Sequence, residues 1–320
     1  MDLYLGIDGG GIRTTAIVAN EKGKVLAKTV GGSIDYKTIG LTAARNNLKN
    51  IVNELLSKTE EKTFKCACIG STALNGRAGS KETLNLTTNI VEAENIIMDS
   101  SIFTAMECML DSGPCALVIC GIDSMVAART AKGKMLKAGG WGYLLGNEGS
   151  GYSIAIDAIC YSLRAYEGSE APTALLKEML DFFDAFTPSE LKDRFFDPVT
   201  QRDKISAFTS RVFSCASAGD KTAIEIIAKH AKLIAATTKS LIKDFPADTS
   251  IGLWGGVFVN NRRFRNEFSA AMYEQSADYK IEPLNYPAEC GALFASYKMD
   301  NIEINEELMK NIDLYRGVRV

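Results

Sequence analysis

The chain has 320 residues, of which 46% are hydrophobic and 23% are charged, and its formal net charge is −3. This length is sufficient for two domains with substantial cores. No basic stripe or arginine cluster stands out, so we expect no nucleic-acid partner. The first residues lead directly into an apolar strand, and no apolar run approaches the roughly 20 residues of a membrane span. We therefore expect a cytoplasmic protein that has no membrane partner.

The first strand ends in a run of glycines. Residues Leu3–Gly11 read LYLGIDGGG, and Arg13, Thr14 and Thr15 follow shortly after them. Glycines let main-chain N–H groups approach phosphate oxygens, a threonine hydroxyl adds a donor, and Asp8 can hold Mg²⁺ through its waters. This order predicts a turn that binds a metal-bound polyphosphate. A hairpin whose tight turn requires glycine is the alternative.

A second copy of this pattern begins more than a hundred residues later, where Leu117–Ser124 again runs an apolar strand into Gly-Ile-Asp. In each copy a second strand leads to a lysine-flanked turn, which is Lys22-Gly23-Lys24 in the first copy and Lys132-Gly133-Lys134 in the second. A repeat at this separation indicates two similar subdomains, because the repeats of a solenoid are much shorter. We therefore expect two phosphate-binding turns.

Strand-like and helix-like segments alternate along the chain, which indicates an α/β protein. After the first three strands we expect a helix over 41–56, a strand over 65–70, a strand ending at 99 and a helix over 101–110. The second half is expected to contain three strands between 116 and 137, a helix over 151–165, a helical insertion over about 173–217, a helix over 223–243, a strand over 250–254, a helix over 261–276, a strand over 279–282 and a helix over 290–297. A closing helix is expected within 302–320.

The cysteines and the single histidine do not suggest a metal site. The eight cysteines are scattered and form no C-x-x-C pair, so buried reduced thiols are expected rather than a disulfide or metal framework. His230 lies in a helical run, where a solvated or core position is expected rather than a catalytic one. Catalytic triads based on histidine are excluded.

Four motifs recur in order along nearly the whole chain. They are Gly6–Gly11 (GIDGGG), Gly140–Tyr152 (GWGYLLGNEGSGY), Gly255–Phe258 (GGVF) and Pro287–Leu293 (PAECGAL). Together with the duplicated strands, they resemble the BadF/BadG/BcrA/BcrD-type ATPase family, which includes the N-acetylglucosamine kinases, within the sugar kinase, Hsp70 and actin superfamily. The resemblance implies duplicated actin-like (ribonuclease H-like) α/β domains with an interdomain cleft.

On this basis we expect an N-terminal domain over residues 1–112 and a C-terminal domain over residues 113–299 that carries the helical insertion. The closing helix over about 300–320 is expected to pack back on the first domain.

The resemblance also implies ATP and Mg²⁺ as cofactors, with ATP in the cleft and Asp8 holding the metal through water. No G-x-x-x-x-G-K-[ST] motif is present, which excludes a P-loop NTPase. The residues implied for the nucleotide, from the phosphates to the adenosine, are Gly9, Gly10, Gly11, Arg13, Thr14, Gly121, Ser124, Gly255, Gly256 and Asn260.

Asp99 is the candidate catalytic base. Phosphoryl transfer needs a carboxylate that accepts the proton of the acceptor hydroxyl. Asp99 ends a strand at the entrance to a helix, which is where open α/β sheets place ligands, and it matches the family's catalytic aspartate in position. The alternative role is the N-cap of that helix, for which Ser100 and Ser101 are rivals.

The resemblance implies a sugar site whose carboxylates and amides can make two hydrogen bonds at once. The chain departs from the family's pattern at Ile12, where threonine is usual, at Ile122-Asp123, where Thr-Gly is usual, and at Gly70-Ser71-Thr72-Ala73, which replaces a Gly-Leu-Ala-Gly turn. Asp123 must be turned away from the phosphates, or offset by metal or by a cation such as Arg13. The implied sugar-binding residues are Ser33, Asp35, where asparagine is usual, Gly140, Trp141, Gly142, Asn147, where aspartate is usual, and Glu148.

We expect an ATP-dependent kinase that phosphorylates an amino sugar, at the 6-hydroxyl of N-acetylglucosamine or of a relative such as N-acetylmuramate or glucosamine. The resemblance supplies the sugar, and it also suggests a homodimer. One alternative is an ATPase that activates a 2-hydroxyacyl-CoA dehydratase-type enzyme, which would carry an iron–sulfur cluster between subunits. Another is a non-catalytic sugar sensor.

Overall fold

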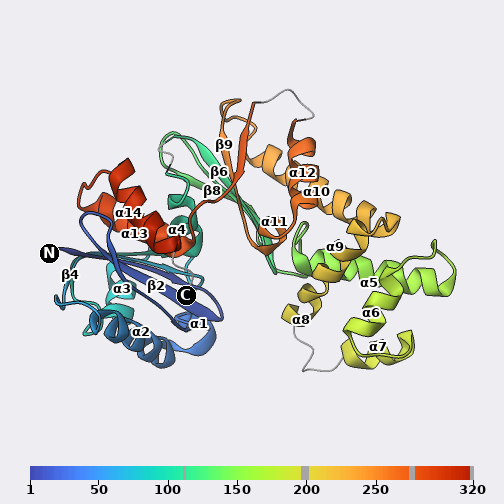
Figure 1. Ribbon diagram of the computed structural model, residues 1–320, viewed down its shortest axis with the longest axis horizontal. Coiled ribbons are helices and arrows are strands. Elements are labelled where there is room, and N and C mark those ends of the chain that lie inside the picture. The colour runs from blue at the N-terminus through green and yellow to red at the C-terminus, as the bar shows by residue number, and fades with distance from the viewer. Residues whose placement is uncertain (111–112, 196–201, 274–277, 318–320) are drawn as a thin grey trace. The chain divides into compact units, whose positions relative to one another are not determined.

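The computed structural model describes residues 1–110, 113–195, 202–273 and 278–317. The chain divides into two compact units, each built around one five-stranded sheet (Figure 1). The first unit contains Met1–Leu110 and Leu284–Val320, and the second contains Asp111–Pro283.

The sheet of the first unit has the strand order β3-β2-β1-β4-β5. Its strands are β1 (Leu3–Gly9), β2 (Arg13–Asn20), β3 (Val25–Gly32), β4 (Phe64–Ser71) and β5 (Ala93–Ser100). β1, β4 and β5 are parallel, whereas β2 is antiparallel to both of its neighbours. The helices of this unit are α1 (Tyr36–Ile39), α2 (Leu41–Leu56), α3 (Ser80–Thr87), α4 (Ser101–Glu107), α13 (Ala288–Met299) and α14 (Glu306–Gly317).

Both faces of this sheet are buried, because its side chains alternate between two hydrophobic clusters. Leu5 and Ile7 of β1 join the cluster that includes Leu48 of α2, whereas Tyr4 joins the cluster that includes Phe294 of α13. In Figure 1, α2 and α13 lie on opposite sides of the sheet. A helix therefore covers each face, as expected for a largely parallel sheet.

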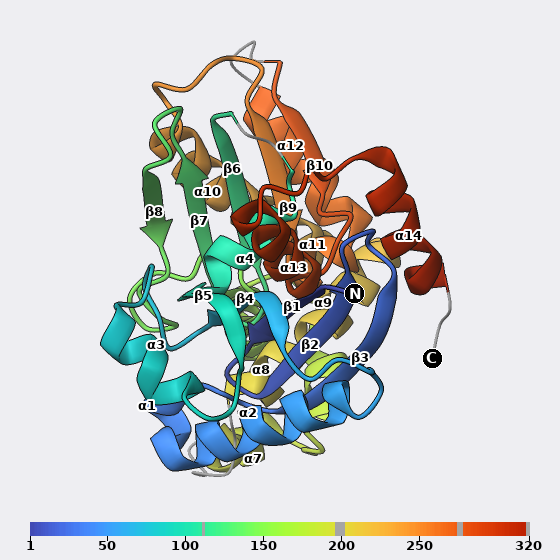
Figure 2. The same ribbon diagram turned by 90° about the vertical axis from the view of Figure 1, so that its left-hand side faces the viewer.

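The sheet of the second unit has the order β10-β9-β6-β7-β8, and its strands lie side by side in Figure 2. Its strands are β6 (Cys115–Cys120), β7 (Ser124–Arg129), β8 (Met135–Gly139), β9 (Ser250–Trp254) and β10 (Lys280–Pro283). Its helices are α5 (Gly151–Glu167), α6 (Leu175–Phe182), α7 (Pro188–Phe195), α8 (Arg202–Ala207), α9 (Thr209–Ser217), α10 (Lys221–Leu241), α11 (Gly256–Val259) and α12 (Arg262–Tyr273).

The predicted duplication is confirmed, since the two sheets share one strand order and one set of strand directions. The lysine-flanked turns also match in detail. Gly23 has φ 78° and donates its N–H to the carbonyl of Asn20 at 3.0 Å, and Gly133 has φ 75° and donates to the carbonyl of Thr130 at 2.9 Å. Both turns require a residue that tolerates positive φ, and glycine does so without strain.

The expected boundary at residue 299 is corrected by α13, which packs on the first sheet. A Cβ on Gly6 of β1 would overlap the backbone of Glu289, and a Cβ on Gly291 would overlap the backbone of Thr104 in α4. These glycines let the helix lie directly against the sheet and against α4. The chain therefore returns to the first unit at Leu284.

The C-terminal helix α14 also belongs to the first unit, where Leu308 and Ile312 join the cluster around α13. The helix over 41–56 and the strand over 250–254 have the predicted bounds, whereas the short helices α1, α3 and α11 were not predicted. The parts of the predictions that fall on residues 111–112, 196–201, 274–276 and 318–320 lie outside the described residues.

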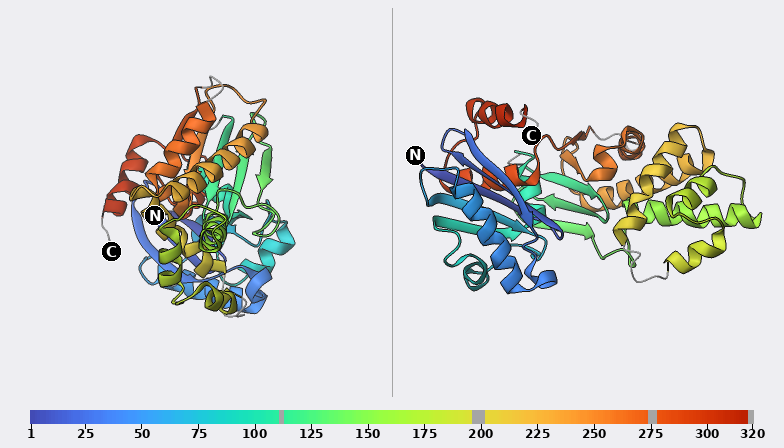
Figure 3. Two further views of the ribbon diagram at one scale, coloured as in Figure 1. Left: turned by 90° about the vertical axis from the view of Figure 1, so that its right-hand side faces the viewer. Right: turned by 60° about the horizontal axis from the view of Figure 1, so that its bottom comes forward.

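The helical insertion is observed as α6 to α9, which lie beside α5 (Figure 3). Phe182, Phe183 and Phe208 form its aromatic centre, with ring centroids 4.9–5.6 Å apart. None of the helices that the structure describes is long and apolar enough to cross a bilayer. Each of the eight cysteines is a thiol, and all but Cys160 are buried.

Candidate functional site

Four residues form a row across the first sheet, at the carboxyl ends of its parallel strands. Thr15 pairs with Asp8, Asp8 pairs with Gly70, and Gly70 pairs with Asp99. Residues that pair directly point to the same face of a sheet. The carboxylates of Asp8 and Asp99 therefore project from one face, with their Cα atoms about 10 Å apart, the width of two strand spacings.

Asp8 is the carboxylate of this row that is suited to a metal ion. Its Oδ1 accepts a hydrogen bond from the hydroxyl of Thr104 at 3.3 Å. Burial, together with the negative charge of Glu289, raises the pKa of Asp8 to about 7. Glu289 is itself buried and accepts an ion pair from Lys28 at 2.7 Å. A divalent cation would favour the ionised form of Asp8, so the residue fits a water-mediated contact to Mg²⁺.

No group of three or more histidine, cysteine, aspartate or glutamate side chains that could hold a metal ion occurs in the described part of the chain. A magnesium ion beside Asp8 would therefore take its remaining ligands from nucleotide phosphates and water, which is how Mg²⁺ is commonly bound.

Asp99 lies at the end of β5, is 6% exposed and is not the cap of the following helix. Ser100 takes the N-cap role, because its Oγ accepts the N–H of Phe103 at 3.3 Å. The Oδ2 atom of Asp99 accepts from Nε of Arg77 at 2.9 Å, and its Oδ1 accepts from the N–H of Ser100 at 2.7 Å. The carboxylate is thus oriented from both sides and stays ionised beside a guanidinium.

Arg77 was not found by sequence reasoning. It lies in the loop between β4 and α3, and its guanidinium carbon is 5.4 Å from the ring centroid of Phe103 in α4. A single arginine in a polar loop gives no signal in the sequence, since its partner Asp99 is 22 residues away.

The glycines of the first turn, Gly9 to Gly11, differ in what the fold requires of them. A Cβ on Gly9 would overlap the side chain of Ile34, so the packing demands glycine there. The N–H of Gly10 donates to the carbonyl of Arg13 at 2.9 Å, which means that the turn itself uses this amide. Gly11 is exposed, and a Cβ there would meet no described atom within 4 Å. The close approach of a ligand would explain a glycine at position 11.

The two threonines after this turn face opposite sides of the sheet. Thr14 is fully buried on the side of Ala16 and α2, and its hydroxyl has no hydrogen-bond partner among the residues described. Thr15 shares the face of Asp8, as its pairing shows. The sequence prediction chose Thr14 for the phosphates. The alternation of β2 instead gives the Asp8 face to Thr15.

Ser33 and Asp35 fix the loop after β3 to the glycine turn. The hydroxyl of Ser33 donates to the carbonyl of Gly10 at 2.9 Å and accepts the N–H of Asp35 at 3.0 Å. Asp35 is the N-cap of α1, where its Oδ1 accepts two backbone N–H groups, and its Oδ2 accepts the hydroxyl of Thr72 at 2.9 Å. The carboxylate therefore has a structural role, which the sequence analysis did not predict.

The second unit brings three further glycines of the predicted nucleotide set together. Gly255 has φ +100°, and a Cβ on it would overlap the carbonyl of Cys120, so α11 begins directly against the turn that contains Gly121. At Gly121 and at Gly256 the structure leaves room for a Cβ, whose nearest described neighbours would be 3.9 Å and 3.6 Å away. Asn260, the C-cap of α11, supplies the neighbour of Gly256.

The loop Gly140–Ser150 is hydrogen-bonded to this turn through Asn147. The Oδ1 atom of Asn147 accepts the N–H of Ser124 at 2.7 Å, and its Nδ2 donates to Oδ1 of Asp123 at 3.1 Å. The hydroxyl of Ser124 donates to the carbonyl of Glu148 at 2.8 Å. The second turn and the predicted sugar loop are thus one hydrogen-bonded assembly.

The negative charge of Asp123 is offset within the second unit. Its Oδ2 forms an ion pair with Arg202 of α8 at 2.9 Å, and Arg202 also lies over the ring of Tyr143 at 5.7 Å. The cation suggested by the sequence was Arg13, and the one found is Arg202. The remaining loop residues are open to solvent, with Trp141 73% exposed and the backbone of Gly140 and Gly142 at positive φ.

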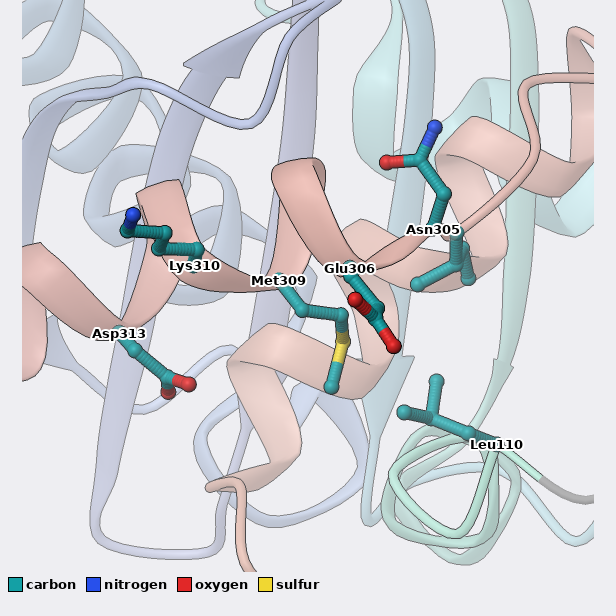
Figure 4. A pocket seen from close by; sticks show the side chains of 7 residues that line it. Leu110, Asn305, Glu306, Met309, Lys310 and Asp313 are labelled. Atoms are coloured by element: carbon teal, nitrogen blue, oxygen red, sulfur yellow. The ribbon is translucent and has the colours of Figure 1, made fainter.

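A pocket of about 590 Å³ lies elsewhere in the first unit. Figure 4 shows Met309 and Glu306 of the C-terminal helix and Leu110, at the far side of α4, around it. α4 begins beside Asp99 and runs away from it toward Leu110. The pocket therefore lies at the opposite end of α4 from the carboxylate row.

Comparison with known proteins identifies relatives over most of the chain. The sequence model of the BadF/BadG/BcrA/BcrD ATPase family matches residues 5–295. An N-acetylmuramic acid/N-acetylglucosamine kinase of Clostridium acetobutylicum is 24% identical over 292 residues, which cover 90% of this chain and 92% of the relative. An N-acetyl-D-glucosamine kinase of Dictyostelium discoideum is 25% identical over 259 residues, which cover 77% of this chain and 81% of the relative.

Solved structures share the fold. A Chromobacterium violaceum protein, solved as a candidate N-acetylglucosamine kinase, has a TM-score of 0.72 at 17% identity and covers 92% of this chain and 98% of its own. A ROK family glucokinase of Streptomyces griseus, solved with glucose and AMPPNP, has a TM-score of 0.58 at 14% identity and covers 92% and 98% of the two chains. At these identities the likeness shows the architecture of actin-like sugar kinases.

Proposed function

The chain belongs to the BadF/BadG/BcrA/BcrD ATPase family, and we propose that it is an ATP-dependent kinase that phosphorylates an amino sugar. The proposed acceptor is the 6-hydroxyl of N-acetylglucosamine or of a relative such as N-acetylmuramate or glucosamine. The names of the two relatives described above support this class of substrate.

One observation carries the proposal, which is that Asp8 and Asp99 share one face at the carboxyl ends of parallel strands. Such edges are where open α/β sheets bind ligands. A phosphoryl transfer needs two separate negative groups, one beside the metal and one beside the acceptor hydroxyl. A spacing of about 10 Å leaves room for a phosphoryl group between them.

Asp99 would act as the general base. The ion pair with Arg77 keeps the carboxylate ionised, and the bond from the Ser100 N–H fixes its orientation. The acceptor hydroxyl would give its proton to Asp99 as its oxygen attacks the γ-phosphorus, and the bond from that phosphorus to the β–γ bridging oxygen breaks to release ADP. Because Ser100 serves as the helix cap, the proton-accepting role of Asp99 does not compete with helix stability.

Asp8 would hold Mg²⁺ through water, and the metal would neutralise charge on the phosphates. In the first unit, Gly11 and Arg13 would approach the phosphates, and Thr15 is better placed than Thr14 to share that face. In the second unit, Gly121 and Ser124 would contact the phosphates. Gly255, Gly256 and Asn260 would lie against the nucleoside.

The sugar would be bound by the two loops that are tied to these turns. Ser33 and Asp35 are fixed to the first glycine turn, and Asn147 to the second, so each recognition loop moves with its turn. Gly140, Trp141, Gly142 and Glu148 complete the proposed set. We expect the enzyme to act on free small-molecule sugars as a homodimer, which light scattering of the purified protein will test.

The test is ADP release with a panel of amino sugars, together with mass and ³¹P NMR identification of the product. A sugar 6-phosphate formed in step with ADP supports the kinase. Sugar binding by calorimetry without ADP release supports the sensor instead. ADP release that ignores every sugar, together with visible absorbance of an anaerobic preparation, supports the dehydratase activator. Seven of the eight thiols are buried, which disfavours an iron–sulfur cluster between subunits.

A further inference from the structure

His230, the single histidine of the chain, lies inside the second unit and contacts the loop that we assign to the sugar. It is on α10 and is 3% exposed. Its Nδ1 accepts the backbone N–H of Gly149 at 3.2 Å, and its Nε2 lies 3.0 Å from Oδ2 of Asp157 in α5. The imidazole therefore bridges α5 and the end of the loop Gly140–Ser150.

These two contacts determine which nitrogen carries the proton. The N–H of Gly149 is a donor, so Nδ1 must offer its lone pair. Oδ2 of Asp157 is a carboxylate oxygen that also accepts from Lys229 at 2.7 Å, so Nε2 must be the donor. The neutral tautomer with the proton on Nε2 satisfies both contacts. The charged groups that face the ring are Asp157 and, through it, Lys229.

The arrangement of Ser153, His230 and Asp157 superficially resembles a hydrolase triad but does not work as one. The hydroxyl of Ser153 donates to the carbonyl of Asn147 at 2.6 Å and is 3.5 Å from Nδ1, which Gly149 already occupies. The serine therefore has a hydrogen-bond partner other than the histidine. What the cluster does is attach the loop to the underlying helices.

The attached loop segment has little freedom to move. Gly149 has φ +84°, and a Cβ on it would lie 3.0 Å from the side chain of Ile234. Its amide is held by His230, while the carbonyl two residues earlier, that of Asn147, is held by Ser153. Asn147 and Glu148 therefore lie between two anchored backbone groups. Loss of the anchor at Gly149 would leave a buried N–H without a partner and would release this segment.

We propose that His230 is a positioning residue for sugar recognition, which holds the backbone of Gly149 so that Asn147 and Glu148 meet the substrate. The identity of the substrate rests on the proposed function, whereas the anchoring of the loop does not. His230 touches neither nucleotide nor reacting atoms, so its loss acts on KM for the sugar rather than on kcat.

Two conservative variants separate the two contacts. In His230→Asn the side-chain oxygen replaces Nδ1, so the bond from Gly149 is kept and the bond to Asp157 is lost. In His230→Gln the side-chain nitrogen replaces Nε2, so the bond to Asp157 is kept and the bond from Gly149 is lost. Thr238→Val is the matched control, because Thr238 is buried on the same helix and donates to the carbonyl of Ile234 within that helix.

We expect His230→Gln to raise KM for the sugar about 10-fold with kcat within about twofold of wild type, because a buried amide loses its acceptor. His230→Asn and Thr238→Val should keep KM within about twofold. ¹⁵N NMR of wild type, in which this one histidine gives an unambiguous signal, should show the tautomer with the proton on Nε2. Equal KM effects of the Asn and Gln variants, or a proton on Nδ1, would overturn the proposal.

Hydrogen exchange of the Gly149 amide keeps the inference testable if wild type phosphorylates no amino sugar, a result that would reject the proposed function alone. The amide should be protected in wild type and His230→Asn and should exchange at least about 10-fold faster in His230→Gln. Equal protection in both variants shows that His230 does not hold the loop, whatever the substrate is.

Discussion

Replacing glycine by alanine separates the glycines that the fold requires from those that a ligand would require. Gly11 and Gly256 are outside the left-handed region, and a Cβ at either site would have no described neighbour closer than 3.6 Å. Gly255 has φ +100°, and its Cβ would overlap the carbonyl of Cys120. Alanine should therefore be accommodated in the first two positions and not in the third.

The expected magnitudes follow from these environments. Gly11→Ala and Gly256→Ala should leave the free energy of unfolding without ATP unchanged or raise it by about 0.4–1 kcal/mol, because alanine has less freedom in the unfolded chain. Gly255→Ala should lower it by about 1–3 kcal/mol through backbone strain. If the phosphates or nucleoside approach Gly11 and Gly256, each methyl group displaces a charge-assisted contact of about 1.5–3 kcal/mol and weakens ATP binding about 10- to 150-fold.

Calorimetry with ATP and Mg²⁺ and urea unfolding of the same preparations measure the two quantities. Gly79→Ala is the matched control, since Gly79 also has open space around its Cβ position and is outside the proposed nucleotide set. Its ATP affinity should equal that of wild type. If Gly11→Ala and Gly256→Ala bind ATP as tightly as wild type while remaining folded, the nucleotide does not approach these glycines and the assignment of the turns is refuted.

Three further predictions test single side chains. Asp99→Asn should lower kcat about 10²- to 10⁴-fold with little change in ATP affinity, and near-normal turnover in steady-state assays would reject Asp99 as the base. The hydrogen bond from His230 holds the pKa of Asp157 at about 2, so this carboxylate should contribute about 1 kcal/mol, after allowance for solvent screening, that is present above pH about 3.9 and lost as the pH falls through about 2. Urea titrations of wild type and Asp157→Asn should therefore differ at pH 7 and converge near pH 2, and a difference that persists at pH 2 contradicts this. Asn147→Asp places a second carboxylate beside Asp123 and should raise KM for the sugar, while adding Asp123→Asn should restore it with a coupling energy of about 1–3 kcal/mol; additive effects would show that the pair is not linked.

The duplicated architecture was predictable because its signals are local. Apolar strands, glycine turns and lysine-flanked hairpins recur within short windows, and the turns at Gly23 and Gly133 have matching hydrogen bonds. The position of Asp99 at the end of a strand was readable for the same reason. The N-cap was not, because Asp99, Ser100 and Ser101 are all capping residue types and only the structure shows that the Ser100 hydroxyl accepts the bond.

Features that depend on distant partners could not be predicted from the sequence. α13 follows the second sheet in the chain, yet it packs on the first, because small residues such as Gly6 and Gly291 permit close approach. Asp35 accepts the hydroxyl of Thr72, which lies 37 residues away. Without the partner, an aspartate in a loop gives no indication of whether it caps a helix or binds a ligand.

The departures from the family's pattern in the second unit become consistent when they are considered together. Asp123 alone would bring an uncompensated negative charge to a phosphate-binding turn. In the structure its two oxygens are taken by Arg202, at 2.9 Å, and by the amide of Asn147, at 3.1 Å. An aspartate at position 147 could not donate that second bond and would repel Asp123, so the amide at 147 and the carboxylate at 123 require each other. Changes that compensate one another are expected of a binding site kept in working order, whereas a site that had lost its ligand would have no reason to keep the pair matched.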